Sequence, residues 1–364
     1  MLPRFFRALA LWLTLFELLA GLRRWHGLSW LGRRFPRALL LILLSAEARV
    51  LRGESREKDP QPSLLALAAL PALTLQLAAS SLRNRRLDPL ARLRPGRYGD
   101  RTVERLDIPL AEGHCPALHV APANGTRAAV LVLHGSGCHK TYFAWRLADA
   151  LLVRGLAVLL VDLDGHGDSP RPQRFPGATE PATAAAAWLR ERYLRVGLLG
   201  VSLGGCIAAR AVADGLAADA LALLEAPPLL QFAPEDRWRE ARALLQPFMF
   251  DLFGEASAYT LGYAVYELVK AQRVPRIVAE ISTWDLIARL DLLANLPRVT
   301  APLLLVYGGR DAIVPPAQAE QVRRAAPGAR FVLVPEASHL TLILHPRALE
   351  ETAGWLAEVL NAEG

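Results

Sequence analysis

The fold is decided by the stretch Val196-Gly-Leu-Leu-Gly-Val-Ser-Leu-Gly-Gly205. Its apolar first half is typical of a short buried strand, and the small residues that follow predict a helix. Ser202 stands at the turn between them, flanked by Gly200 and Gly204, because a tight turn brings neighbouring backbone close. Such a unit exposes the serine and aims the next N–H, that of Leu203, at the oxygen of the carbonyl that the serine would attack. A Gly-rich turn without a chemical role is the alternative.

A serine hydroxyl is a weak nucleophile at neutral pH, so it needs a base and a carboxylate that orients the base. Two downstream loops offer these groups in the order that this architecture uses, with Asp311 before His339. Each follows a predicted parallel strand, so both should lie at the sheet edge that carries Ser202. Either residue alone could be a loop-capping or solvated side chain, but their order and context predict a Ser202, His339, Asp311 catalytic group.

An upstream loop, His134-Gly-Ser-Gly137, follows another apolar strand. Attack on a carbonyl creates an oxyanion, which needs two preorganised N–H donors. We expect the backbone N–H of Ser136 to be one donor and that of Leu203 to be the other. Gly135 and Gly137 complete the loop, and His134 is expected to orient it without taking part in the chemistry.

Five segments carry a resemblance to a known superfamily. They are His134–His139 with Tyr142 shortly after, Asp162–Ser169, Gly200–Gly204, Gly309–Pro315 and Ser338–Leu340. On these motifs the chain resembles the α/β-hydrolase superfamily over roughly residues 128–345, and within it the lipase-like branch of monoacylglycerol lipases, lysophospholipases and related esterases. Val201 departs from the histidine that this branch often has before the serine. The resemblance implies a serine hydrolase that cleaves carboxylic esters through an acyl-enzyme and needs no cofactor.

Strands and helices alternate from residue 128 onward, which favours an α/β fold with a mostly parallel sheet covered on both faces. The expected strands lie near 128–133, 156–162, 196–201, 219–225, 302–307 and 330–335. The expected helices lie near 141–154, 182–193, 204–215, 316–326 and 347–361.

Residues 227–297 contain no strand signal but have amphipathic stretches rich in aromatic residues. The resemblance implies a helical cap insertion here, which would cover the serine and shape an acyl-binding pocket. The aromatic residues are Trp238, Phe248, Phe250, Phe253, Tyr259, Tyr263, Tyr266 and Trp284. Ordinary helical packing of a larger core is the alternative.

The first hundred residues differ in composition from the rest. The apolar stretches 5–22 and 64–80 are long enough to span a bilayer, for which about 17–25 residues are needed, and 38–51 is shorter. Residues 1–106 carry 19 basic and 8 acidic side chains, whereas the remaining residues carry 23 and 27. We therefore expect residues 1–100 to be a membrane-anchoring helical region that faces anionic lipid, and residues 101–364 to be the catalytic domain.

The loop 53–63 is nearly neutral, whereas 23–37 and 83–97 are strongly basic. The positive-inside rule then predicts the catalytic domain on the cytoplasmic side of the membrane. Nucleic-acid binding is the rival explanation of the basic charge, but no nucleic-acid motif accompanies it. A cleavable signal peptide is a second rival, but no small-x-small cleavage site precedes Leu22-Arg-Arg24.

Other chemistries are disfavoured by the motifs. Asp162, Asp164, His166 and Asp168 alternate as metal ligands could, but Gly165 and Gly167 interrupt them, and a structural turn is the better interpretation. No phosphate loop is present. The three cysteines suit a reducing compartment. An acyltransferase or thioesterase with the same triad, and a non-catalytic membrane scaffold on a relic hydrolase fold, remain as alternatives, and the oligomeric state stays open.

Overall fold

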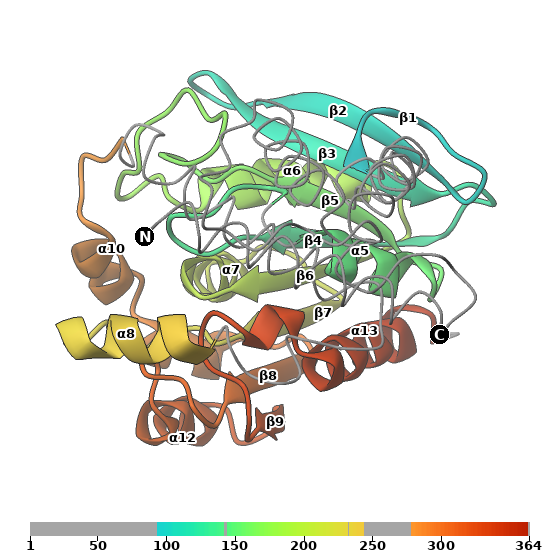
Figure 1. Cartoon of the computed structure of the whole chain (residues 1–364). Coiled ribbons are helices and arrows are strands. Elements are labelled where there is room, and N and C mark those ends of the chain that lie inside the picture. The colour runs from blue at the N-terminus through green and yellow to red at the C-terminus, as the bar shows by residue number, and fades with distance from the viewer. Residues whose placement is uncertain (1–92, 142–143, 232, 244–277, 363–364) are drawn as a thin grey trace, which may run out of the picture. The chain divides into compact units, whose positions relative to one another are not determined.

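The computed structural model describes residues 93–141, 144–231, 233–243 and 278–362 (Figure 1). The chain divides into two compact units, and all of these residues belong to the unit made of Arg92–Phe250 and Thr260–Gly364. Across the described ranges, no helix is both long enough and apolar enough to cross a bilayer. The three predicted membrane segments lie outside the described residues: 5–22, 38–51 and 64–80.

A nine-stranded sheet forms the centre of this unit, in the order β1-β2-β3-β5-β4-β6-β7-β8-β9. The strands are β1 (Gly96–Arg97), β2 (Arg101–Pro109), β3 (His114–Pro122), β4 (Ala128–Leu133), β5 (Ala157–Val161), β6 (Arg195–Val201), β7 (Ala220–Leu224), β8 (Leu303–Gly308) and β9 (Arg330–Val334). The six strands predicted from residue 128 onward are all present, and they pair in parallel. The predicted α/β fold is confirmed.

The first three strands, β1 to β3, were not predicted. They pair antiparallel with one another, and β3 joins β5 antiparallel, so they extend the parallel sheet on one side. The sequence of β2, Arg-Thr-Val-Glu-Arg-Leu-Asp-Ile-Pro, exposes or half-exposes most of its side chains. An antiparallel strand near a sheet edge needs only one buried face, so it lacks the continuous apolar run that marks the central strands.

Eight α-helices are described: α5 (Ala144–Leu152), α6 (Glu180–Arg190), α7 (Leu203–Ala213), α8 (Pro234–Ala243), α10 (Thr283–Leu290), α11 (Leu292–Asn295), α12 (Pro316–Ala325) and α13 (Pro346–Leu360). Two short 3-10 helices, η4 (Leu296–Arg298) and η5 (Leu342–Leu344), complete the described elements. All five helices predicted from the sequence are present. α5 and α13 pack together on one face of the sheet, whereas α6, α7 and α12 pack on the other.

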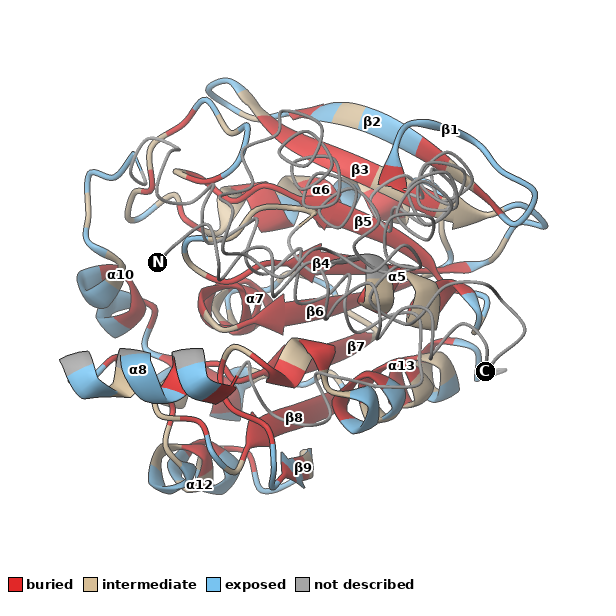
Figure 2. Cartoon of the chain, in the orientation of Figure 1, coloured by how far each residue is buried: buried red, intermediate tan, exposed pale blue. Residues whose placement is uncertain are grey.

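The core lies between the sheet and these helices, because the central strands are buried on both faces (Figure 2). Every residue of β4, β5 and β7 is buried. The helices show buried stripes toward the sheet and exposed ones toward solvent, as amphipathic helices should. Burial on both faces fixes the strands firmly, so the loops at their carboxyl ends start from rigid positions.

The predicted cap region is described only in part, since residues 244–277 lie outside the described ranges. α10 and α11 pack against α7, and Leu286, Ile287 and Leu292 belong to the main hydrophobic core. One face of α10 and α11 thus contributes to the main core. Trp238 on α8 and Trp284 on α10 are exposed, at 72% and 45%.

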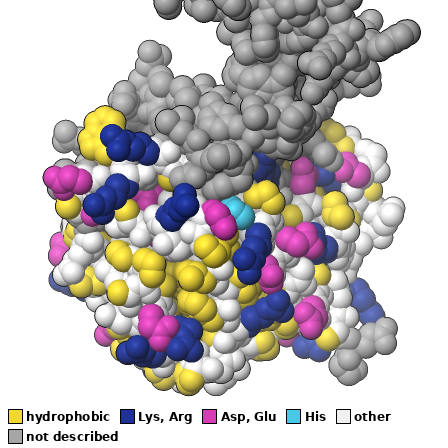
Figure 3. Space-filling model, turned by 60° about the horizontal axis from the view of Figure 1, so that its bottom comes forward, with side chains coloured by type: hydrophobic (Ala, Val, Ile, Leu, Met, Phe, Trp, Pro, Cys, Tyr) yellow, Lys and Arg dark blue, Asp and Glu magenta, His cyan; other side chains and the backbone are white. Residues whose placement is uncertain are grey.

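The surface of this unit carries both signs of charge. On the face drawn in Figure 3, basic and acidic side chains are interspersed, with hydrophobic side chains between them. Many of the basic groups have an acidic partner, such as Arg323 with Glu320 and Arg330 with Glu351. This mixed surface agrees with the near balance of charge that the sequence shows beyond residue 106.

Candidate active site

Ser202 occupies a strained turn between β6 and α7. Its backbone φ of 51° and ψ of −117° lie in a region that non-glycine residues rarely adopt. The flanking glycines allow this turn. A Cβ on Gly200 would lie 2.4 Å from the carbonyl oxygen of Gly204, and a Cβ on Gly204 would lie 2.3 Å from that of Leu133. Both distances are too short for any side chain, which explains the Gly-x-Ser-x-Gly pattern.

The structure brings the three predicted catalytic side chains together. His339 Nε2 lies 3.1 Å from Ser202 Oγ, and His339 Nδ1 lies 2.9 Å from Asp311 Oδ2. Asp311 is fixed in turn, because its Oδ1 accepts hydrogen bonds from the backbone N–H groups of Ile313 and Val314 at 2.8 and 2.6 Å. With Nδ1–H donating to Asp311, Nε2 is left as the acceptor for the serine proton. The arrangement can therefore activate a serine hydroxyl.

The loop after β4 lies directly against Ser202. A Cβ on Gly135 would come within 3.3 Å of Ser202 Cβ, and Gly137 has a left-handed φ of 74°. Within the described residues, no acceptor is found for the backbone N–H of Ser136 or of Leu203. The two predicted oxyanion donors thus stand beside the serine with free N–H groups. Ser136 is also held from the other side, since its hydroxyl lies 3.1 Å from that of Thr283 at the start of α10.

His134 holds this loop in place, as predicted. Its Nδ1–H donates to the carbonyl oxygen of Gly135 at 2.8 Å, and its Nε2 accepts from the backbone N–H of Leu163 at 3.1 Å. Burial lowers the pKa of His134 to about 3, so the imidazole stays neutral and keeps one donor and one acceptor.

A pocket opens over Ser202. Its polar lining includes Ser136, Ser202, Glu225 and His339, which come from four different loops. Its apolar lining consists of Val132, Leu147, Val201, Leu340 and Ile343. The pocket therefore places the Ser202 hydroxyl beside aliphatic walls.

The alpha/beta hydrolase family model matches residues 130–353, which is more than half of the chain. The chain belongs to the alpha/beta hydrolase family. Among curated relatives, a pimeloyl-(acyl-carrier protein) methyl ester esterase of Chromobacterium violaceum is 32% identical over 247 residues, which are 61% of this chain and 92% of the relative. The same-named esterase of Xanthomonas campestris pv. campestris is 30% identical over 254 residues, which are 62% of this chain and 94% of that protein.

Solved structures with the same fold include an esterase from Exiguobacterium antarcticum, with a TM-score of 0.51, 17% identity, and coverage of 70% of this chain and all of that one. DcsB in complex with its substrate analogue gives a TM-score of 0.55 and 18% identity, and covers 71% of this chain and 99% of that one. At these identities the likeness shows the fold alone. The family and the named relatives identify this alpha/beta hydrolase as an enzyme that acts on ester bonds.

The segment 162–169 of this hydrolase is a structural turn, as the sequence indicated. The buried carboxylate of Asp162 accepts hydrogen bonds from the backbone N–H groups of Lys140 and Asp168, at 2.7 and 2.8 Å, and pairs with the Lys140 ammonium. Asp164 pairs with Arg171 at 3.1 Å. A Cβ on Gly167 would meet the Asp162 carboxylate, so glycine is required there. The Asp162 carboxylate is thus engaged by the protein's own donors.

Two buried glutamates near His339 were missed by the sequence reasoning. Glu225 directly follows β7, and its Oε2 lies 4.0 Å from His339 Nδ1. Glu240 on α8 accepts hydrogen bonds from the backbone N–H groups of Ala312 and Leu340, at 2.8 and 3.1 Å. The position of Glu225 at the carboxyl end of a predicted strand was a usable signal. No local pattern marks Glu240, because its partners are 72 and 100 residues away.

The two carboxyls beside His339 change how it titrates. Burial lowers the pKa of His339, but the charges of Asp311 and Glu225 outweigh burial and raise that pKa to about 10. Burial also raises the pKa of Glu225 well above its ordinary value, against the opposing effect of the His339 charge. A proton held by Glu225 removes one of the charges that favour the imidazolium, so the neutral imidazole forms at lower pH.

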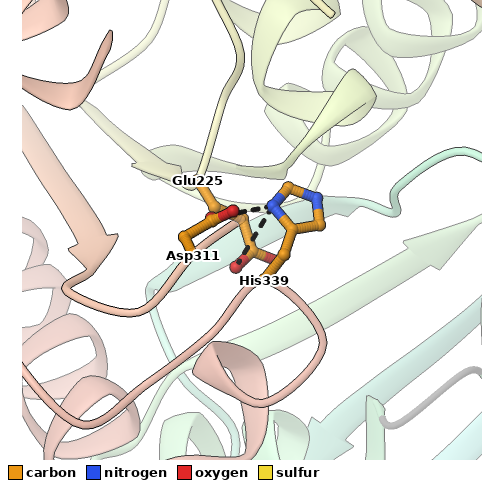
Figure 4. A group of neighbouring side chains, drawn as sticks. All are labelled: Glu225, Asp311 and His339. Carbon is orange, nitrogen blue, oxygen red and sulfur yellow. Dashed lines mark hydrogen bonds and ion pairs between the residues drawn. The ribbon is translucent and has the colours of Figure 1, made fainter. Parts of the chain in front are cut away.

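Glu225, Asp311 and His339 also offer ligand atoms within 4.8 Å of one another, as a metal site would (Figure 4). Both ring nitrogens of His339 already face Asp311 and Ser202, however. An ion bound at Nδ1 would replace the hydrogen bond to Asp311. This geometry suits the imidazole to proton transfer better than to ligation.

Proposed function

We propose that the chain is a membrane-associated serine hydrolase that cleaves carboxylic esters through an acyl-enzyme. Ser202 Oγ attacks the carbonyl carbon while its proton passes to His339 Nε2, and Asp311 stabilises the resulting imidazolium. The tetrahedral intermediate collapses, the ester C–O bond breaks, and His339 returns the proton to the leaving alcohol. Water then attacks the acyl-enzyme by the same steps and releases the acid.

The single observation that carries this proposal is the continuous hydrogen-bonded series from Ser202 through His339 to Asp311. The oxyanion would be held by the N–H groups of Ser136 and Leu203. Losing one such donor in other hydrolases lowers the rate by about 10²–10³-fold. The glycines of the elbow and of the 134–137 loop serve this geometry, because they allow both backbones to approach the reacting carbon.

We propose an acyl or lipid ester as the substrate. The aliphatic lining of the pocket suits an acyl chain, and among the described lining residues the ionisable side chains are Glu225, Lys140 and the histidines. Lys140 is occupied by Asp162 and Asp168. The relatives named as pimeloyl-(acyl-carrier protein) methyl ester esterases favour an ester of a small alcohol on an acyl chain.

The substrate is tested with a panel of p-nitrophenyl and methyl esters of graded chain length, added to the purified full-length protein. We expect kcat/KM to rise with acyl length until the pocket is filled, and acid to be the product. Adding a second alcohol distinguishes a hydrolase from an acyltransferase. An acyltransferase would then form the new ester faster than the free acid. A flat response to chain length would contradict the proposed acyl pocket.

We further propose that residues 1–100 anchor the catalytic domain, residues 101–364, to a membrane on its cytoplasmic side, with residues 227–297 as the cap. The basis is the apolar and arginine-rich composition of the N-terminal region. Single cysteines at positions 56 and 95 test the orientation in intact cells. A membrane-impermeant maleimide should label Arg56→Cys and spare Pro95→Cys; the reverse pattern would contradict the orientation.

A further inference from the structure

Glu225 is a buried carboxyl that the proposed Ser202, His339, Asp311 mechanism does not use. It follows β7 at the sheet edge that carries the site, is 2% exposed, and lines the pocket over Ser202. Its backbone φ is 46°, a strained value for a glutamate. Only three described non-glycine residues have a positive φ, and two of them, Ser202 and Glu225, face this pocket. A strained backbone conformation of this kind persists only where the surrounding structure fixes it, and such residues cluster at functional sites.

The carboxyl of Glu225 is directed at His339 (Figure 4). Its Oε2 lies 4.0 Å from His339 Nδ1 and has no hydrogen-bond partner within the described residues. Asp311 approaches the same nitrogen at 2.9 Å. The imidazole therefore meets two carboxyls from two different strand ends on its Nδ1 side, whereas its Nε2 meets the serine alone.

We propose that Glu225 is a second positioning carboxyl for His339, which supports the imidazolium together with Asp311 and replaces it when Asp311 is lost. The inference rests on the proposed function, because it concerns the base of that mechanism. A carboxyl 4.0 Å from Nδ1 needs a shift of only about 1 Å to reach hydrogen-bond distance. No other described carboxyl oxygen is both buried without a partner and this close to the ring.

The two carboxyls differ in how they are held. Asp311 accepts two backbone N–H groups through Oδ1, so its side chain is held in one orientation. Oε2 of Glu225 has no such donor among the described residues, and the His339 charge opposes the rise in the Glu225 pKa that burial causes, so the two groups titrate as a pair. The ionisable groups that interact with this pair are Asp311, Glu240 from α8 and Tyr307 from β8. Charge on Glu225 stabilises the imidazolium that forms during catalysis.

The experiment compares the full-length wild type with Asp311→Asn, Glu225→Gln and the double variant, using kcat/KM for a p-nitrophenyl ester across pH. We expect Asp311→Asn to lose about 10²-fold and the double variant about 10⁴-fold, the loss typical when a sole triad carboxyl becomes an amide. Glu225→Gln should move the acidic limb of the pH profile down by about one unit, because one charge that favours the imidazolium is gone.

The matched control is Glu320→Gln, which removes an exposed carboxylate from α12 and should leave the profile unchanged. Asp311→Asn keeps Glu225 in place, so its residual activity tests the proposal even if Glu225→Gln does not fold. Equal losses in Asp311→Asn and the double variant, with a wild-type pH profile in Glu225→Gln, would overturn it.

A second readout separates this inference from the proposed function. Imidazole NMR titration of His339 needs no turnover, and we expect a lower pKa in Glu225→Gln than in the wild type. An unchanged titration would overturn the role of Glu225. Full hydrolysis by Ser202→Ala would instead overturn the proposed function, and the titration would still decide whether Glu225 acts on His339.

Discussion

The carboxylate of Glu240, on α8, accepts a hydrogen bond of 3.1 Å from the backbone N–H of Leu340, the residue that directly follows His339. The same carboxylate accepts the N–H of Ala312, which directly follows Asp311. The buried Glu240 side chain therefore connects the loop that carries His339 to the loop that carries Asp311. Among the α8 side chains whose burial the structure describes, Glu240 and Ala243 are buried, whereas Glu235, Trp238, Arg239 and Arg242 are exposed.

We predict that Glu240→Gln lowers kcat about 10-fold with a smaller change in KM, because a displacement well below 1 Å at the base is costly. An amide can accept only one of the two N–H groups through its oxygen, and its NH₂ group would oppose the other. Steady-state kinetics check this. Glu235→Gln, on the exposed side of the same helix, is the matched control and should behave as wild type. Equal kinetics for Glu240→Gln and Glu235→Gln would contradict the role of Glu240 in connecting the two loops.

The glycines of the elbow give a prediction about stability. Gly204→Ala should lower the free energy of unfolding by about 3 kcal/mol or more, because its Cβ would lie 2.3 Å from the Leu133 carbonyl oxygen. Gly354→Ala, in α13, is the matched helical control. A Cβ there meets nothing within 4 Å, so we expect a gain of about 0.5–1 kcal/mol. Denaturant unfolding checks both, and similar changes in the two variants would contradict the close approach.

The buried neutral His134 predicts an acid-sensitive fold. Burial lowers its pKa from 6.5 to about 3. Between pH 6.5 and about 3, His134 binds a proton in the unfolded chain but not in the folded one. The free energy of unfolding is therefore unaffected by this group above pH 6.5 and decreases as the pH falls toward about 3. We expect His134→Gln to flatten this dependence by up to about 1.4 kcal/mol per pH unit. Urea unfolding across that window measures it, and parallel curves for both proteins would contradict the assignment.

The sequence predicted the parallel half of the sheet and the helices between its strands, because central strands buried on both faces form uninterrupted apolar runs. The order of Ser202, Asp311 and His339 at strand ends was readable for the same reason, since parallel strands collect their loops at one edge. β2 could not be recognised, because only three of its nine residues are buried, one of them is Arg101, and charged residues lie between them. Glu240 could not be assigned either, because its role depends on tertiary contacts with loops far away in the chain.

The labelling of Ser202 by a fluorophosphonate probe tests the central claim most directly. We predict that the full-length wild type is labelled covalently, that Ser202→Ala is not, and that circular dichroism shows both to be folded. The reason is that only a serine activated by His339 reacts readily with such a probe. Equal labelling of Ser202→Ala, or an unlabelled wild type with a native fold, would contradict the account.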